Sequence, residues 1–220
     1  MSKIEILTKT QKCLLVALGQ SRIITDNFYL SGGTALAAFY IPYRYSEDLD
    51  FFSSNEIDVS ALTIFWKSQQ AALGIDSFEY QQSFNRNLYF LEFEGEKIKI
   101  EFTHYPFSRI ETGKKEFGLE IDSLLDIAVN KLFTIYQQPR ARDFMDLYMI
   151  CQKKKCLISD LNAKAKIKFD WHVDPIQLGT QFFKVEEAKD YPRLVIPLDE
   201  KFWKDFFKTE AQKLKSKILK

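Results

Sequence analysis

The stretch FYLSGGTALAAFYIPYRYSEDLDFF, residues 28–52, decides how the rest of the chain is interpreted. It opens with an apolar run at residues 28–30, which predicts a short buried strand. Gly32 and Gly33 follow, and because neither carries a Cβ, the backbone can turn sharply there and a ligand can come close. Residues 34–40 favour a helix that ends before Pro42, so Gly33 and Thr34 are expected near a helix N-terminus. The exposed N–H groups of such an end bind phosphate well.

Two acids, Asp48 and Asp50, lie near the end of this stretch and alternate with Leu49 and Phe51. Side chains at positions i and i+2 share one face of a strand, so a strand over residues 48–53 would align the two carboxylates. Aligned carboxylates repel each other unless they are neutralised. Mg²⁺ neutralises them and brings substrate phosphates with it. The alternative is an exposed strand whose acids are solvated.

The composition is that of a folded protein. The chain of 220 residues has 46% hydrophobic and 28% charged residues, which suits one domain or one domain with a compact helical appendage. A formal net charge of +1 excludes a uniformly basic nucleic-acid binder but leaves room for a local basic patch. Three cysteines without framework spacing favour a reducing cytoplasm, and Cys151 and Cys156 are interpreted as incidental. We find neither a membrane-spanning run nor a signal peptide.

The periodicity of the chain changes near its middle. Helices are expected over residues 4–19 and 59–72, and a period of two over residues 77–105 predicts three strands. Residues 107–120 indicate a loop with a short edge strand. From residue 122 onward helical spacing predominates, with helices expected over 122–138, 140–150, 158–166, 177–189 and 199–220. The pattern predicts an α+β chain.

A glycine-rich turn from strand to helix, followed by a strand with two carboxylates, resembles the opening of the polymerase β-like nucleotidyltransferases. More narrowly, the stretch resembles the AbiEii branch, which contains toxins of type IV toxin–antitoxin and phage-defence systems. The residues that carry this resemblance are Ser31, Gly32, Gly33, Thr34, Ala35, Leu36, Arg44, Ser46, Asp48, Leu49, Asp50 and Phe51. The resemblance implies a polymerase β-like core, a mixed sheet flanked by helices, in residues 1–120. A helical subdomain in residues 121–220 would complete the active-site cleft.

The resemblance also implies a third carboxylate on a neighbouring strand, and Glu101 lies between Ile100 and Phe102 on the last of the three predicted strands. Glu101 would complete a site for Mg²⁺ or Mn²⁺ with Asp48 and Asp50. The alternative is an exposed cross-strand partner for a lysine. The groups that the resemblance assigns to nucleotide binding are Ser31, Gly32, Gly33, Thr34, Arg44, Ser46 and Lys131. One departure from the pattern is Glu47, an extra acid beside Asp48.

Lys131 and the segment RARDFMDL, residues 140–147, form a second group in the helical half. Their spacing places Arg142, Asp143 and Asp146 on one side of a helix. An ion-pair network that holds two helices together explains Arg142 and Asp143 as well as a functional role does. AbiEii-like proteins have a lysine on a helix followed by Arg-Asp-x-x-Asp-Leu, which this segment matches. The resemblance implies that Lys131 contacts the triphosphate.

An aspartate of this segment would orient or deprotonate the acceptor hydroxyl, because a carboxylate within hydrogen-bond reach can take its proton. Both Asp143 and Asp146 are candidates. We favour Asp146, because Asp143 adjoins Arg142 and is a candidate for structural pairing. The catalytic residues predicted in this way are Asp48, Asp50, Lys131 and Asp146, with Arg142 and Asp143 as structural or accessory residues.

The resemblance implies a cytoplasmic, metal-dependent nucleotidyltransferase that moves NMP from an NTP to an acceptor hydroxyl, on an RNA such as tRNA. It also implies a separately encoded antitoxin and no membrane partner. The segment 201–220 has seven lysines against two acids, which is typical of a solvated helix face or of a surface that guides an RNA backbone. Two other functions remain open: a catalytically inactive protein that binds nucleotide or RNA, and a small-molecule transferase of the antibiotic-modifying type.

Overall fold

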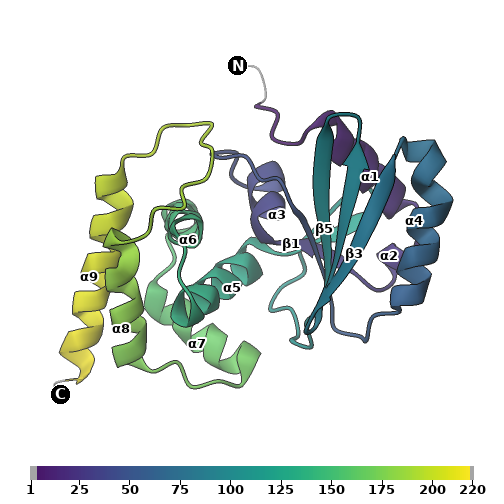
Figure 1. The fold of residues 1–220 in the computed structure, drawn as a ribbon. Helices are drawn as coiled ribbons and strands as arrows, with labels where there is room; N and C mark the ends of the chain where they lie inside the picture. The colour runs from purple at the N-terminus through teal and green to yellow at the C-terminus, as the bar shows by residue number, and fades with distance from the viewer. Residues whose placement is uncertain (1–3, 219–220) are drawn as a thin grey trace. The chain divides into compact units, whose positions relative to one another are not determined.

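The computed structural model describes residues 4–218, with side chains described as far as Leu214 (Figure 1). The chain divides into two compact units. The first contains the residues up to Ser108 together with Thr112–Ser123, and the second contains Arg109–Glu111 and the residues from Leu124 on. Within the described residues, no helix is both long enough and apolar enough to cross a membrane. The domain boundary at residue 120 stays a prediction.

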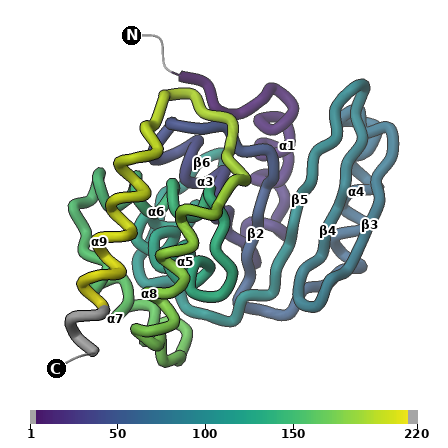
Figure 2. The backbone as a smooth tube through the Cα atoms, turned by 60° about the vertical axis from the view of Figure 1, so that its left-hand side comes forward, coloured from purple at the N-terminus to yellow at the C-terminus, as the bar shows by residue number. Residues whose placement is uncertain are grey.

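The described part of the first unit contains a seven-stranded mixed sheet with the order β3-β4-β5-β2-β1-β7-β6. Its strands are β1 (Tyr29–Ser31), β2 (Leu49–Ser53), β3 (Ser77–Ser83), β4 (Arg86–Phe93), β5 (Glu96–His104), β6 (Lys114–Glu116) and β7 (Leu119–Ile121). The pairs β2–β5 and β1–β7 are parallel and the other pairs are antiparallel. Figure 2 shows β3, β4 and β5 running side by side, which confirms the three strands predicted from the period of two.

The helices of the first unit are α1 (Lys9–Gly19), α2 (Arg22–Thr25), α3 (Gly32–Phe39) and α4 (Val59–Leu73). Helix α4 agrees with its prediction within one residue, because Asp58 caps its start and Gly74, with a φ of 67°, ends it in the left-handed region. Helix α1 was predicted from residue 4 and begins instead at Lys9. A capping box between Thr8 and Gln11 sets this start.

Aromatic packing in the sheet determines which side of each strand faces the core. Leu49 and Phe51 of β2 and Ile100 and Phe102 of β5 are fully buried, and the rings of Phe51 and Phe102 stack with centroids 5.4 Å apart. A shift in register by one residue would turn these side chains outward, so their burial fixes the register. The intervening residues of both strands, including Asp50, therefore share the opposite face.

The β6–β7 hairpin differs from the predicted loop with an edge strand. Strand β7 pairs in parallel with β1 inside the sheet, and β6 lies beyond it at one edge. Leu119 and Ile121 are fully buried. Three residues are too short for a period of two to be recognised, so the sequence pattern did not indicate this strand.

The second unit is helical. Its elements are α5 (Leu124–Gln137), α6 (Ala141–Lys154), α7 (Ile158–Phe169), α8 (Pro175–Phe183), the 3₁₀ helix η1 (Lys184–Glu186) and α9 (Glu200–Ile218). Helix α5 packs against α6, α7 and α8, and α9 packs against α6 and α8. Helix α8 starts two residues before its prediction, because Asp174 caps it and Pro175 fits its first turn. It ends at Phe183, well before the predicted residue 189.

Candidate active site

The Gly32–Gly33 turn joins β1 to α3 and packs against other predicted site residues. Gly32 has a φ of 71°, in the left-handed region that favours glycine. A Cβ on Gly32 would lie 2.5 Å from Asp50 Oδ2. A Cβ on Gly33 would lie 2.8 Å from Ser46 Oγ and against the guanidinium of Arg44. A side chain at either glycine would therefore displace a residue of the predicted site.

The two hydroxyls beside this turn have partners within the protein. Ser31 Oγ donates to Asp122 Oδ2 at 2.7 Å, and both side chains are buried. Thr34 Oγ1 donates to the backbone carbonyl of Asp48. These hydroxyls hold the turn and the start of β2 in place. The first N–H groups of a helix such as α3 have no acceptor within the helix, and such groups bind phosphate.

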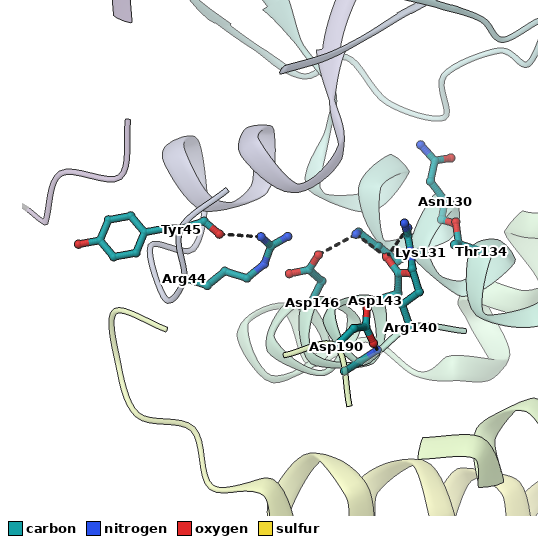
Figure 3. Close-up of polar contacts among 10 residues, drawn as sticks. Arg44, Tyr45, Asn130, Lys131, Thr134, Arg140, Asp143, Asp146 and Asp190 are labelled. Carbon is teal, nitrogen blue, oxygen red and sulfur yellow. Dashed lines mark hydrogen bonds and ion pairs between the residues drawn. The ribbon is translucent and has the colours of Figure 1, made fainter. Parts of the chain in front are cut away.

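The loop from Arg44 to Asp48 is held by a side chain from α1. Buried Gln11 donates from Nε2 to the carbonyl oxygens of Ser46 at 2.9 Å and Glu47 at 3.0 Å. Arg44 is also buried and donates to the carbonyl of Tyr45 at 2.8 Å (Figure 3). Sequence reasoning missed both Gln11 and Asp122, because their partners lie far away in the chain.

Strands β2 and β5 place carboxylates side by side. In their parallel register Asp50 lies opposite Glu101, while Leu49 lies opposite Ile100 on the core side. The predicted strand began at residue 48, but β2 begins at Leu49 and Asp48 directly precedes it. Lys99 Nζ lies 2.8 Å from Asp48 Oδ2. Lys99 therefore partly neutralises the charge of Asp48 beside Asp50.

Glu101 is engaged by an arginine that sequence reasoning did not single out. Arg86 Nε donates to Glu101 Oε1 at 2.6 Å, and Arg86 Nη2 donates to Oε2 at 2.5 Å. Thr103 Oγ1 adds a hydrogen bond of 2.8 Å. Burial raises the pKa of Glu101, but the hydrogen bonds from Arg86 and Thr103 outweigh it and hold the pKa below its usual value. Glu101 is thus a buried anion, and Lys99 Nζ, 3.7 Å from its Oε2, adds a second positive charge beside it.

The donors on this face suit a hard divalent cation in their chemistry. Carboxylate oxygens are the ligands that Mg²⁺ and Mn²⁺ prefer. In the part of the chain that the structure describes, no three His, Cys, Asp or Glu side chains are grouped closely enough to hold a metal ion. The pKa of Arg86 is raised by its hydrogen bond to Glu101 and further by the charges of Asp50 and Asp48. The carboxylates of Asp48 and Asp50 suit the cation in their chemistry, whereas both oxygens of Glu101 already accept hydrogen bonds from Arg86.

Lys131, Asp143 and Asp146, three of the four residues predicted for the helical unit, meet in one ion-pair cluster (Figure 3). Lys131 Nζ from α5 lies 2.7 Å from Asp143 Oδ1 and 2.7 Å from Asp146 Oδ2, both on α6. The lysine side chain is 10% exposed and both aspartate side chains are fully buried. Arg140 Nε lies 2.7 Å from Asp143 Oδ2. The cluster joins two helices and holds a lysine between two carboxylates.

Both carboxylate oxygens of Asp143 accept hydrogen bonds from basic side chains. Burial raises its pKa, but the charge of Lys131 and the hydrogen bond from Arg140 outweigh it, and the pKa is lowered. The arginine that contacts Asp143 is Arg140, whereas the sequence analysis pointed to the adjacent Arg142. Arg142 is half-buried. The contacts of Asp143 therefore favour a structural role for it.

Part of the positive charge of α9 is compensated by ion pairs. The pairs join Lys204 to Glu200 at 2.7 Å, Lys208 to Glu186 at 2.7 Å, and Lys213 to Glu210 at 2.6 Å. These contacts favour the solvated helix face over the RNA-guiding surface for this part of the chain.

The chain matches known proteins over most of its length. The profile of the nucleotidyl transferase AbiEii toxins of type IV toxin–antitoxin systems matches residues 14–216. An uncharacterised protein of Aquifex aeolicus is 31% identical over 157 residues, which make up 70% of each chain. A candidate nucleotidyltransferase from H. pylori has a TM-score of 0.63 at 19% identity, over 96% of this chain and 97% of its own. The JHP933 structure from Helicobacter pylori has a TM-score of 0.63 at 20% identity, over 95% and 90%.

The two solved structures confirm the predicted fold class, a mixed sheet followed by a helical region. The profile covers both the Gly-Gly turn with its carboxylates and the lysine–aspartate cluster. The chain therefore belongs to the AbiEii family of nucleotidyl transferase toxins of type IV toxin–antitoxin systems.

Proposed function

We propose that this protein transfers NMP from an NTP to a hydroxyl group of an RNA such as tRNA, with release of pyrophosphate. The observation that carries the proposal is the position of Asp50, which lies against Gly32 at the start of α3 and opposite Glu101 in the sheet. A helix N-terminus suits the anionic oxygens of a triphosphate, and adjacent carboxylates suit the cation that accompanies it. An NTP meets both requirements at once.

In this proposal Asp48 and Asp50 would hold Mg²⁺ or Mn²⁺, with Glu101 as a third ligand once Arg86 has released it. The cation supplies positive charge against the triphosphate and fixes its orientation. The first N–H groups of α3 would bind phosphate oxygens, with Ser46 and Arg44 beside them. Catalysis would then rest mainly on positioning and on the stabilisation of charge.

Lys131 is proposed to offset charge on the triphosphate, because an ammonium group is a compact charge for phosphate oxygens. Asp146 is proposed to accept the proton of the attacking hydroxyl. The contacts of Asp143 support this choice, since both of its oxygens already accept from Arg140 or Lys131. Asp146 Oδ2 lies 2.7 Å from Lys131 Nζ, so the proposed base lies beside the lysine that would contact the triphosphate.

The family consists of toxins from type IV toxin–antitoxin systems, and we propose a separately encoded antitoxin as the cellular partner of this chain. Expression in cells tests for such an antitoxin. Expression of the chain alone should stop growth, and co-expression of the antitoxin from a neighbouring gene should restore growth. Growth arrest by a variant without transferase activity would contradict the link between toxicity and chemistry.

The acceptor is tested by incubating the protein with each α-³²P-labelled NTP, Mg²⁺ or Mn²⁺, and one of three acceptors: purified tRNA, ribosomal RNA or an aminoglycoside. We expect label in tRNA that ribonuclease removes. Label on the aminoglycoside but on neither RNA would overturn the RNA acceptor in favour of a small-molecule transferase. Absence of label on every acceptor would favour a protein that only binds nucleotide or RNA.

A matched pair of variants separates chemistry from local charge in this assay. Asp48→Asn should abolish labelling, whereas Glu47→Gln should leave it unchanged. Glu47 is exposed and directly precedes Asp48, and only its backbone carbonyl is held by Gln11. Equal loss in both variants would show that the general charge of this loop matters and not the proposed ligand.

A further inference from the structure

Two cysteines at the end of α6 lie in contact. Cys151 is in the last turns of the helix, and Cys156 follows the point where Lys155, with a φ of 53°, turns the chain back. Their sulfur atoms are 3.3 Å apart, and both residues are thiols. Four residues separate the two cysteines in the sequence, and this spacing gives no signal of such a contact.

The two thiols differ in their surroundings. Cys151 is buried, with 4% of its surface exposed, whereas Cys156 is partly exposed. The hydrogen bond to Cys151 lowers the pKa of Cys156 to about 7, assisted by the charge of Lys154 and opposed by burial and Asp160. The same hydrogen bond, together with burial, raises the pKa of Cys151. Cys156 is therefore the sulfur that ionises first and that a reagent can reach.

We propose that Cys156 and Cys151 form a redox modification site that reacts with hydrogen peroxide and closes to a disulfide, which a thiol reductant reopens. The Cys156 thiolate attacks one peroxide oxygen, the O–O bond breaks, and the departing hydroxide takes up a proton to become water. Cys156 is then a sulfenic acid. The Cys151 sulfur attacks the Cys156 sulfur, the S–O bond breaks, and the hydroxyl leaves with the Cys151 proton as a second water.

The electrons balance, because the two thiols together lose two electrons and one molecule of hydrogen peroxide gains them. The geometry favours it, since a disulfide bond of about 2.05 Å requires the sulfurs to approach by only about 1 Å. The bond would tie the connector between α6 and α7 to the end of α6. Helix α6 also carries Asp143 and Asp146, so the site lies on an element of the proposed active site.

The test uses the full chain, treated with hydrogen peroxide, denatured and alkylated with N-ethylmaleimide, then digested with trypsin without reduction. Trypsin cleaves after Arg142, Lys153, Lys155 and Lys164, so the two cysteines fall in separate peptides, residues 143–153 and 156–164. We expect mass spectrometry to find these peptides joined as one species that dithiothreitol separates. Exposed Cys13 serves as the internal control and should remain alkylated at the same peroxide dose.

Two variants assign the roles of the sulfurs. In Cys151→Ser, Cys156 should stop at the sulfenic acid, which dimedone traps. In Cys156→Ser, Cys151 should stay a thiol at doses that oxidise the wild type. Oxidation of Cys13 before the pair, or conversion of Cys156 to the sulfinic acid without a linked peptide, would overturn the proposal. Thermal unfolding of each variant checks that it is folded.

Discussion

Lys131 and Lys168 are both buried lysines of the helical unit, and the ammonium group of each lies 2.7 Å from an aspartate oxygen. Their partners differ. Asp126, the partner of Lys168, also accepts backbone N–H groups from Ile110 at 2.7 Å and Glu111 at 3.0 Å. Lys131 instead lies between two aspartate side chains, and its own side chain is 10% exposed against 0% for Lys168.

The difference leads us to propose that, of these two similar ion pairs, the Lys131 cluster takes part in the chemistry and the Lys168 pair is structural. Asp126 has both oxygens bonded to a lysine or to the backbone, so it holds a loop against α5 and α7. The Lys131 cluster contains two carboxylates around one ammonium group, and we propose that Asp146 exchanges this ammonium group for a substrate hydroxyl. A buried ion pair by itself does not identify a catalytic residue, because structural networks produce the same distances.

The largest effect is expected for Asp146→Asn. If Asp146 is the base, nucleotide incorporation should fall by about 10²–10⁴-fold, the usual contribution of general acid–base catalysis. The change is isosteric and leaves Lys131 paired with Asp143, so the free energy of unfolding should fall by only about 1–3 kcal/mol. Incorporation assays and urea unfolding measure the two effects separately.

The matched control is Asp143→Asn, which removes the carboxylate that forms ion pairs with both Lys131 and Arg140. It should cost more stability than Asp146→Asn and less activity per folded molecule. The reverse order would assign the base to Asp143.

Lys168→Met should have the next largest effect, on stability and not on chemistry. It leaves the buried Asp126 without its lysine, and breaking a buried pair in this way costs about 3–5 kcal/mol. Incorporation per folded molecule should stay within a few-fold of the wild type. The double variant Lys168→Met with Asp126→Leu should recover part of the lost stability, since removing both charges is less costly than removing one.

A smaller effect should appear in acid. The pKa of Asp143 is lowered in the folded protein, whereas an unfolded aspartate titrates near ~3.9. A lowered folded pKa contributes stability that is complete above the unfolded pKa and is lost as the pH falls through the folded value. The free energy of unfolding should therefore decrease below about pH 5, and less steeply in Asp143→Asn. An identical slope in both proteins would contradict this assignment.

The smallest change in stability is expected for Arg86→Met. Its side chain is 47% exposed, so solvent screens the pair and the cost should be about 1 kcal/mol. If Glu101 is a metal ligand, this variant releases it and should lower the Mg²⁺ concentration needed for half-maximal incorporation. Glu101→Gln should raise that concentration. Unchanged Mg²⁺ dependence in both variants would show that Glu101 is structural.

Local patterns predicted those parts of the fold that depend on nearby residues. The period of two located β3, β4 and β5, and the Gly-Gly turn located the junction of β1 with α3. Strand β7 was missed because its place in the sheet depends on pairing with β1, about ninety residues earlier in the chain. Helix starts at Lys9 and Pro175 depended on caps that the hydrophobic pattern does not reveal.

The site shows the same division. Asp48, Asp50, Lys131 and Asp146 are predicted as site residues because their spacing and family pattern are visible in the sequence. The partners that constrain them were not, because each is distant in the chain: Asp122 for Ser31, Gln11 for the loop at Ser46, and Arg86 for Glu101. Spacing therefore supplies the candidate residues, and packing decides which of their atoms are already bonded.

The central claim is that this chain moves a nucleotide and that Asp48 and Asp50 are required. It is tested most directly by comparing NTP labelled at the α-phosphate with NTP labelled at the γ-phosphate, using RNA as acceptor. We predict that wild-type protein transfers the α-label and not the γ-label, and that the folded double variant Asp48→Asn with Asp50→Asn transfers neither. Transfer of the γ-label, or equal α-label transfer by the double variant, would contradict the account.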